Sequence, residues 1–283
     1  DGAKVTDELF NNLVINPSID SVQEFKIQKS QYPAEFGGKA SALINVATKA
    51  GANRFTGSLF EFFRDDAFDA TNYFLPQGQD NPPLRQNQFG GAFGGPLVKN
   101  RTFFFGSYEG QRLKRTQTRT FSVPSAALRS GDFSGLGAIC DPTPTGCVPF
   151  AGNQIPANRI DPIAAAMLRS VAMPTGAGNV QNLSAAEQLT KEVNQFSLRL
   201  DHRLPDSDQL FARFSTFGAD ETQPFGTSVL SESIVPGFGR TLDTKTKNLV
   251  ASHTHVIGNS LLNEVRFGWM AVKGGQRSVN RGV

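Results

Sequence analysis

The feature that most limits how this chain can fold is a series of strand-length segments joined by links that are alternately short and long. Seven segments of about this kind occur, and most carry apolar residues at alternate positions; they span 54–64, 86–97, 102–112, 193–204, 209–218, 244–257 and 261–272. A tilted strand needs about 9–11 residues to cross a bilayer. The segments therefore have the length expected of membrane-crossing strands.

The last segment shows the alternation most clearly. Val265, Phe267 and Trp269 fall on one face, and Glu264 and Arg266 fall on the other, because successive side chains of a strand point to opposite sides. A soluble β-sandwich also alternates, with its apolar face turned toward a core. In a membrane barrel the apolar set faces lipid and the charged set faces inward. Alternation alone leaves both folds open.

The lengths of the links favour the barrel. Three links are short, at 98–101, 205–208 and 258–260, and three are long, at about 65–85, 113–192 and 219–243. Outer-membrane barrels have short periplasmic turns and long extracellular loops. The sequence therefore predicts a mainly β fold, a partial antiparallel transmembrane β-barrel over 54–283. All short turns should lie at one end of the sheet, and all long links at the other.

The longest predicted loop, about 113–192, has local patterns of its own. Asp161 before Pro162 predicts a short capped helix, and 184–187 fits a capping box that would begin another. Cys140 and Cys147 are the only cysteines. In an oxidising compartment they would form a disulfide that closes a small loop, and two unpaired thiols are the alternative.

The first 53 residues differ from the rest. Strand candidates at 21–28 and 42–49 are separated by a segment whose Pro and Gly residues, at 32–38, predict a loop. We interpret 1–53 as a small mixed unit that precedes the barrel. The chain begins at Asp1 without an initiator Met or a signal peptide, so we expect a fragment of a longer protein.

Several function classes receive no support. No stretch approaches the roughly 18 apolar residues of a transmembrane helix, and a net charge of +3 is too small to indicate nucleic-acid binding. No Gly-x-Ser-x-Gly motif is present, and no residue set forms a catalytic constellation. We therefore expect no enzyme and no cofactor. His253 and His255 share a strand face and could begin a metal site, but the sequence shows no third ligand, so a polar strand face is the simpler interpretation.

Several motifs resemble a known family. The segments 19–25, 34–38 and 44–51 resemble the end of the plug domain of TonB-dependent outer-membrane receptors. Others resemble the Oar-like branch of these receptors; they are 57–64, 85–91, 94–105, 108–110 and 152–160. The resemblance covers nearly the whole chain, and 85–110 is its most specific part.

The resemblance implies the C-terminal part of a small α/β plug domain at 1–53, followed by the first third of a barrel of about 22 strands. It implies a receptor in the outer membrane of a Gram-negative bacterium, surrounded by lipid. Such a receptor imports an unknown extracellular ligand with energy from the inner-membrane TonB complex. The TonB box, and often a carboxypeptidase-regulatory-like domain, would belong to parts of the protein outside this chain.

The plug interpretation also predicts partners for the charges on inward faces, Arg199, Arg213, Glu264 and Arg266, because buried polar walls need hydrogen-bonding groups. Two alternatives stay open. One is a non-transporting Oar-like protein that serves adhesion or surface organisation, and the more distant one is a secreted β-sandwich binding module. The ligand is not readable from the sequence, since a family does not fix its substrate; siderophore, cobalamin, glycan and peptide all remain possible.

Overall fold

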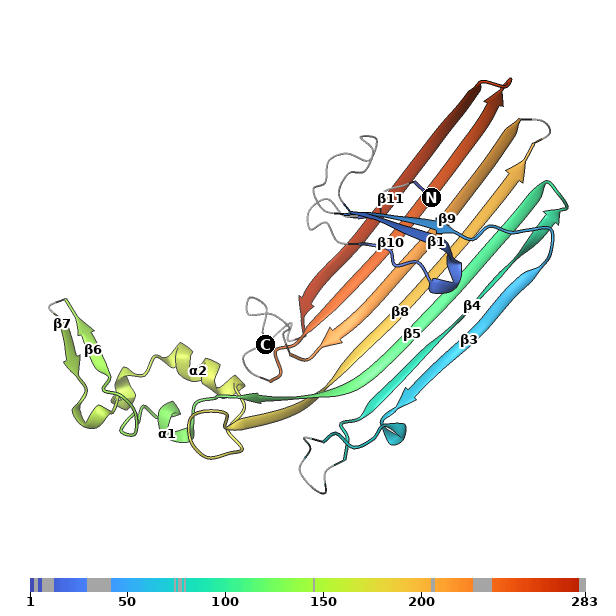
Figure 1. Cartoon of the computed structure of the whole chain (residues 1–283). Coiled ribbons are helices and arrows are strands. Elements are labelled where there is room, and N and C mark those ends of the chain that lie inside the picture. Colours follow the sequence, from blue (N-terminus) through green and yellow to red (C-terminus); the bar gives the residue numbers. More distant parts are fainter. Residues whose placement is uncertain are drawn as a thin grey trace. The chain divides into compact units, whose positions relative to one another are not determined.

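The structure, a computed structural model, describes residues 1–2, 5–6, 13–29, 42–73, 75, 78, 80–144, 146–204, 207–225 and 236–279. The predicted loop at 32–38, with the resemblance segment 34–38, lies outside these residues. The described part contains one seven-stranded sheet and two two-stranded sheets (Figure 1). Among the described helices, none is long and apolar enough to span a membrane.

The seven-stranded sheet contains each predicted strand in chain order. Its members are β3 (Thr56–Asp65), β4 (Leu84–Val98), β5 (Thr102–Phe121), β8 (Leu183–Arg203), β9 (Asp208–Gln223), β10 (Arg240–Ile257) and β11 (Leu261–Ser278). Each strand pairs with the next one of this list, so the order across the sheet is β11-β10-β9-β8-β5-β4-β3. Successive arrows run in opposite directions (Figure 1). The short turns after β4, β8 and β10 therefore share one end, and the long links share the other, as predicted. The sheet is open in this chain.

Several strands extend further toward the long-link end than predicted. β5 continues to Phe121, and β8 begins at Leu183, so the longest link is 122–182 and the predicted bounds of 113–192 were wrong. The helix predicted from the capping box at 184–187 is also wrong, because these residues lie in β8. Residues 114–120 are polar or charged, so the apolar alternation stops there. Pairing continues because the neighbouring strand still satisfies the backbone N–H and C=O groups.

The N-terminal part forms the small strand pair that the sequence predicts. β1 (Val22–Lys29) and β2 (Ala42–Thr48) pair antiparallel, and a 3-10 helix, Ile19–Ser21, leads into β1. The buried Ser21 donates its hydroxyl to the carbonyl of Ser18 at 2.6 Å. Its own carbonyl accepts from Lys49 N, directly after β2, at 2.8 Å. The entry to β1 and the exit from β2 are therefore held together.

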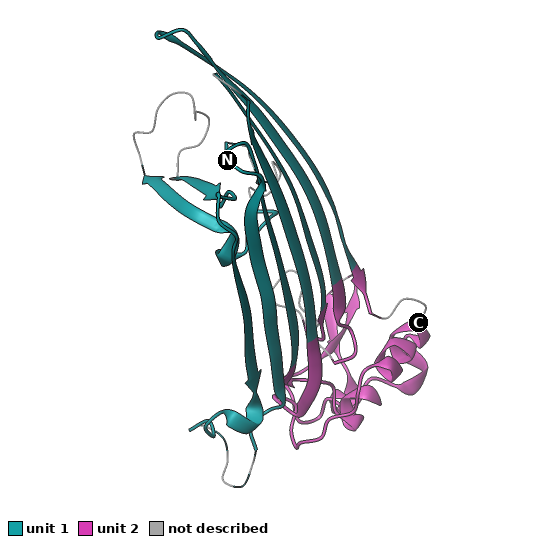
Figure 2. Ribbon diagram, turned by 90° about the vertical axis from the view of Figure 1, so that its right-hand side faces the viewer, with its two compact units in different colours: residues 1–114, 190–221, 242–276 teal, residues 115–189, 222–241, 277–283 magenta. Residues whose placement is uncertain are grey.

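The chain divides into two compact units, coloured in Figure 2. The first comprises 1–114, 190–221 and 242–276, and the second comprises 115–189, 222–241 and 277–283. Besides the sheet strands and the N-terminal pair, the first unit has a 3-10 helix, Asp66–Phe68.

The second unit contains the whole of the longest link, 122–182. Its elements are α1 (Ala126–Arg129), β6 (Cys140–Thr143), β7 (Gly146–Pro149), α2 (Pro162–Ser170) and 3-10 helices at Ala151–Asn153 and Ala157–Arg159. Its small core consists of Phe121, Val123, Leu183 and Phe225. The side chain of Asn182, buried beside this core, accepts from Val123 N and donates to Val123 O, both at 2.8 Å.

The helix predicted after Asp161 is confirmed as α2. Asp161 accepts hydrogen bonds from the backbone N–H groups of Ile163 at 2.7 Å and Ala164 at 3.1 Å. At the other end of α2, Arg129 Nη1 donates to the carbonyls of Leu168 at 2.7 Å and Val171 at 2.9 Å. Both helix ends thus have their free backbone groups satisfied.

Candidate functional site

Hydrogen bonds between strands show which side chains of the sheet share a face. Arg213 Nη2 in β9 donates to Asn248 Oδ1 in β10 at 3.0 Å, and the hydroxyls of Ser197 and Ser215 lie 3.0 Å apart. We call the side that carries these residues the inner face. It bears polar side chains, which are Ser197, Arg199, Asp201, Arg213, Ser215, Thr246, Asn248 and Ser252.

The other side, the outer face, follows from the alternation of strand side chains. It is largely apolar in the middle of the sheet, and its exposed members include Phe93, Phe196, Leu198, Leu200, Leu210 and Phe214. The rings of Phe93 and Phe104 lie with their centroids 5.7 Å apart on this face. A broad row of exposed aromatic and aliphatic groups is the surface expected to face lipid hydrocarbon.

Arg199 connects the inner face with the N-terminal strand pair. Its guanidinium pairs in two-pronged fashion with Asp201, with Nε–Oδ2 at 2.9 Å and Nη2–Oδ1 at 2.8 Å. Its Nη1 donates to the backbone carbonyl of Thr48, in β2, at 3.0 Å. The guanidinium carbon Cζ of Arg199 lies 4.7 Å from the ring centre of Phe211. Arg199 is thus fixed by β8 and β9 and holds the end of β2.

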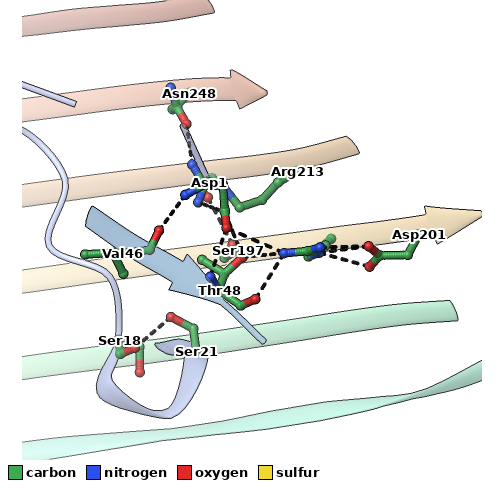
Figure 3. Close-up of polar contacts among 11 residues, drawn as sticks. Asp1, Ser18, Ser21, Val46, Thr48, Ser197, Asp201, Arg213 and Asn248 are labelled. Carbon is green, nitrogen blue, oxygen red and sulfur yellow. Dashed lines mark hydrogen bonds and ion pairs between the residues drawn. The ribbon is translucent and has the colours of Figure 1, made fainter. Parts of the chain in front are cut away.

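Asp1 supplies the second connection (Figure 3). Its carboxylate accepts from Thr48 N at 3.0 Å and Thr48 Oγ1 at 2.8 Å. It also pairs with Arg213 Nη1, and it lies 3.5 Å from Arg199 Nη1. The carboxylate side chain is 4% exposed and the Arg213 side chain 11% exposed. Two arginines of the sheet therefore hold one buried carboxylate of the N-terminal segment.

A cavity of about 400 Å³ lies on the inner face nearer the long links. Its lining includes Asn16 from the N-terminal segment and polar groups of β5, β8 and β9, among them Glu109, Gln111, Lys191, Gln195 and Glu221. Lys191 Nζ and Glu221 Oε2 pair at 3.4 Å. A cavity with charges of both signs and several amide groups can recognise a polar solute by hydrogen bonds.

The structure tests where the four charges predicted to face inward lie. Arg199 and Arg213 contact Thr48 and Asp1 of the N-terminal segment, as described. Glu264 Oε1 accepts from Ser252 Oγ, on the inner face, at 3.1 Å, and Arg266 pairs with Glu264. All four side chains thus lie on the inner face, and two of them have partners in the segment predicted to be the plug.

The glycine-rich run of β4 allows close contact between neighbouring elements. A Cβ at Gly90 would lie 2.4 Å from the carbonyl oxygen of Tyr108, and one at Gly95 would lie 2.1 Å from the ring of Phe55. Just after β2, a Cβ at Gly51 would lie 2.3 Å from the carbonyl oxygen of Phe104. Close approach of neighbouring backbone and ring atoms therefore accounts for these glycines.

The structure brings the two cysteines together in the β6–β7 hairpin. Cys140 and Cys147 are joined by a disulfide, with Cα atoms 5.5 Å apart, inside the range of about 4.4–6.8 Å that disulfides occupy. β6 and β7 pair with Pro142 opposite Cys147. The oxidation state of the pair in the cell stays a prediction.

One polar group was missed by the sequence reasoning. His253 and His255 do share a face of β10, and the structure places Asp208, the first residue of β9, against both. The signal that could have found Asp208 is the short turn after β8. Antiparallel pairing places the beginning of β9 beside the end of β10, which is where the two histidines stand.

An antiparallel sheet with an apolar outer face and a polar inner face, short turns at one end and long links at the other, defines the wall of an outer-membrane β-barrel. The chain belongs to the family of outer membrane beta barrel domains, whose match covers residues 47–283. It is therefore an outer-membrane protein.

One curated relative is the TonB-dependent transporter Oar of Myxococcus xanthus. It is 30% identical over 138 residues, which make up 47% of this chain and 12% of that protein. The chain thus matches only a small part of the length of this relative. No solved structure matches the chain significantly.

Proposed function

We propose that the chain is part of a TonB-dependent receptor of the Oar-like branch, with 1–53 as the end of the plug domain and 54–283 as the beginning of the barrel. The observation that carries the proposal is the ion-pair network in which Arg199 and Arg213 of the sheet hold Asp1 and Thr48. An N-terminal segment bound to the inner face is the arrangement that a plugged barrel requires. The resemblance to a TonB-dependent transporter supports the same assignment.

In this proposal the receptor imports an extracellular ligand with energy from the TonB complex and has no enzymatic activity. The ligand approaches from the side of the long links, where the polar cavity between Asn16 and the inner face of β5, β8 and β9 lies. The cavity contains both a cation and an anion, Lys191 and Glu221, so a polar ligand suits it better than a hydrocarbon. Outer-membrane lipid surrounds the outer face.

The second candidate is a non-transporting Oar-like protein that serves adhesion or surface organisation. The observation in its favour is the long link 122–182, which contains two helices and a hairpin. A structured extracellular segment of this kind can bind another surface. In this case the contacts between the N-terminal segment and the inner face would close the barrel and would have no role in transport.

Growth experiments separate the two candidates. A strain without the complete gene and a strain without TonB are grown with ferric siderophore as iron source, with cobalamin, and with oligosaccharide or peptide as carbon source. Transport predicts that both strains fail on the same nutrient, and that the wild-type gene restores growth of the first strain. Normal growth on every nutrient, together with a loss of surface attachment, would favour adhesion instead.

A further inference from the structure

The strongest unassigned cluster lies on the outer face at the short-turn end of β9 and β10. His253 Nε2 lies 2.6 Å and His255 Nδ1 lies 2.8 Å from the same carboxylate oxygen, Asp208 Oδ1. One ligand atom from each residue lies within 4.8 Å of the other two. Asp208 lies an odd number of positions from the inner-face residue Arg213 in β9, and His253 lies an odd number from Asn248 in β10. Because successive side chains of a strand point to opposite faces, the cluster is on the outer face.

We propose that Asp208, His253 and His255 bind a divalent transition-metal ion of the Zn²⁺ type. Two neutral imidazoles and one carboxylate are a common ligand set for Zn²⁺, with water as the fourth ligand. Tetrahedral ligands at about 2.0–2.1 Å from zinc lie about 3.3 Å from one another. Each histidine nitrogen would therefore move away from Asp208 Oδ1 by only about 0.5–0.7 Å to admit the ion.

The surroundings of Asp208 hold its carboxylate in place. Ser207 Oγ donates to the second oxygen, Asp208 Oδ2, at 3.1 Å. The backbone around Asp208 is also held, because Val256 N donates to Ser207 O and Leu204 N donates to Asp208 O, each at 3.0 Å. Partners of this kind orient a ligand and raise metal affinity.

The site is also reachable from water. The side chains of His253, His255 and Asp208 are 42%, 35% and 22% exposed. They stand beside the short turns, which form the periplasmic rim of an outer-membrane barrel. The bound ion joins the beginning of β9 to the end of β10 there. The inference concerns the outer face, so it does not depend on whether the protein transports a ligand.

The experiment uses the complete protein, purified from outer membranes in detergent and stripped of metal with a chelator. Co²⁺ serves as a spectroscopic probe, and Zn²⁺ is then added in competition. The variants are His253→Gln and Asp208→Asn, and the matched control is His202→Gln. His202 is the third histidine of the chain, and its Nδ1 lies 2.8 Å from the hydroxyl of Thr102. Heat-modifiable mobility on gels verifies that each variant is assembled.

The proposal predicts that the wild type and the His202→Gln control bind one Co²⁺ more per chain than His253→Gln and Asp208→Asn. The extra ion should show visible bands typical of nitrogen ligands, which Zn²⁺ abolishes. Ser207→Ala should keep the site but weaken its affinity about 10–100-fold. Lipid phosphates that copurify bind metal equally in all variants, so they cancel in the difference. Equal Co²⁺ binding by the wild type and Asp208→Asn would overturn the proposal.

Discussion

On the outer face of β11, Val265, Phe267 and Trp269 are 58%, 56% and 45% exposed, whereas on the inner face the side chain of Arg213 is only 11% exposed. In this sheet the exposed side chains are apolar and the buried one is charged, which is the reverse of the usual distribution in a soluble protein. The apolar groups of the outer face need no specific partner, because they form no hydrogen bonds. Arg199 and Arg213 of the inner face are largely buried, at 16% and 11% exposed, and a buried charge needs a positioned counter-charge or acceptor.

The two faces should tolerate different substitutions. A substitution on the outer face should be judged by polarity alone, because hydrocarbon accepts any apolar side chain. The effect of a substitution on the inner face should depend on whether it leaves a buried polar or charged partner without its contact.

Replacing Arg213 by Met should have the largest effect. It removes the main partner of the buried Asp1 carboxylate, and breaking a buried ion pair costs about 3–5 kcal/mol. The free energy of unfolding of the complete protein, measured by urea titration in detergent, should fall by an amount of this order. The hydrogen bond from Arg213 to Asn248 is lost as well.

Arg266→Met is the matched control on the same face. The side chains of Arg266 and its partner Glu264 are 39% and 40% exposed, and exposed ion pairs contribute about 0–1 kcal/mol. The control should therefore change the unfolding free energy by no more than about 1 kcal/mol. Equal losses for the two variants would mean that burial by the N-terminal segment does not decide the effect.

The second prediction concerns the outer face. Phe267→Arg places a charge at a lipid-facing position near the middle of β11, where Arg costs about 2–4 kcal/mol. Met270→Arg adds the same group on the opposite face and should cost less than about 1 kcal/mol. The folded fraction in outer-membrane fractions, from heat-modifiable gel mobility, should drop for the first variant only. If both variants assembled equally well, the strand would not lie in a bilayer, and a soluble sandwich would explain the sheet better.

Much of the sheet was predictable because lipid imposes a regular pattern. All seven strands, their order and the common end of the short turns followed from apolar alternation and link length. The outer ends of β5 and β8 did not, since Lys114 and Arg115 interrupt the pattern while backbone pairing continues. The alternation of apolar and polar residues depends on the solvent around a strand. It does not show how far the strand continues to pair with its neighbours in water.

The site was predictable only in part. The inward orientation of Arg199 and Arg213 followed from their strand positions, but their partner Asp1 is about 200 residues away in the sequence, and no local pattern connects them. The contact of Asp208 with His253 differs, because antiparallel pairing after the short turn places the beginning of β9 beside the end of β10. A contact such as that of Asp1 with Arg213, which joins segments distant in sequence, leaves no spacing signal.

The third prediction concerns the β6–β7 hairpin, which belongs to neither face of the sheet. Thiol labelling without reductant should leave Cys140 and Cys147 unmodified in exported protein. Replacing both by Ser removes a short cross-link whose effect on chain entropy is about 2.5 kcal/mol. Hydrogen exchange should quicken in residues 140–149 and remain unchanged in β9 and β10. Free thiols in the wild type would show that the pairing is wrong.

The smallest expected effect is at the beginning of α2, which also belongs to neither face. Asp161→Ala removes the acceptor for the N–H groups of Ile163 and Ala164, and the loss of such a cap costs about 1 kcal/mol. Asp161→Asn keeps an oxygen in the same place and should cost much less, so it is the matched control. Hydrogen exchange in 162–170 should quicken about fivefold for Ala, since about 1 kcal/mol corresponds to that factor in a local opening equilibrium. Because the cap contacts neither Arg213 nor lipid, assembly into the membrane should stay at the wild-type level. A loss of assembly in Asp161→Ala would mean that the long link helps to form the wall, and the rule drawn from its two faces would then be incomplete.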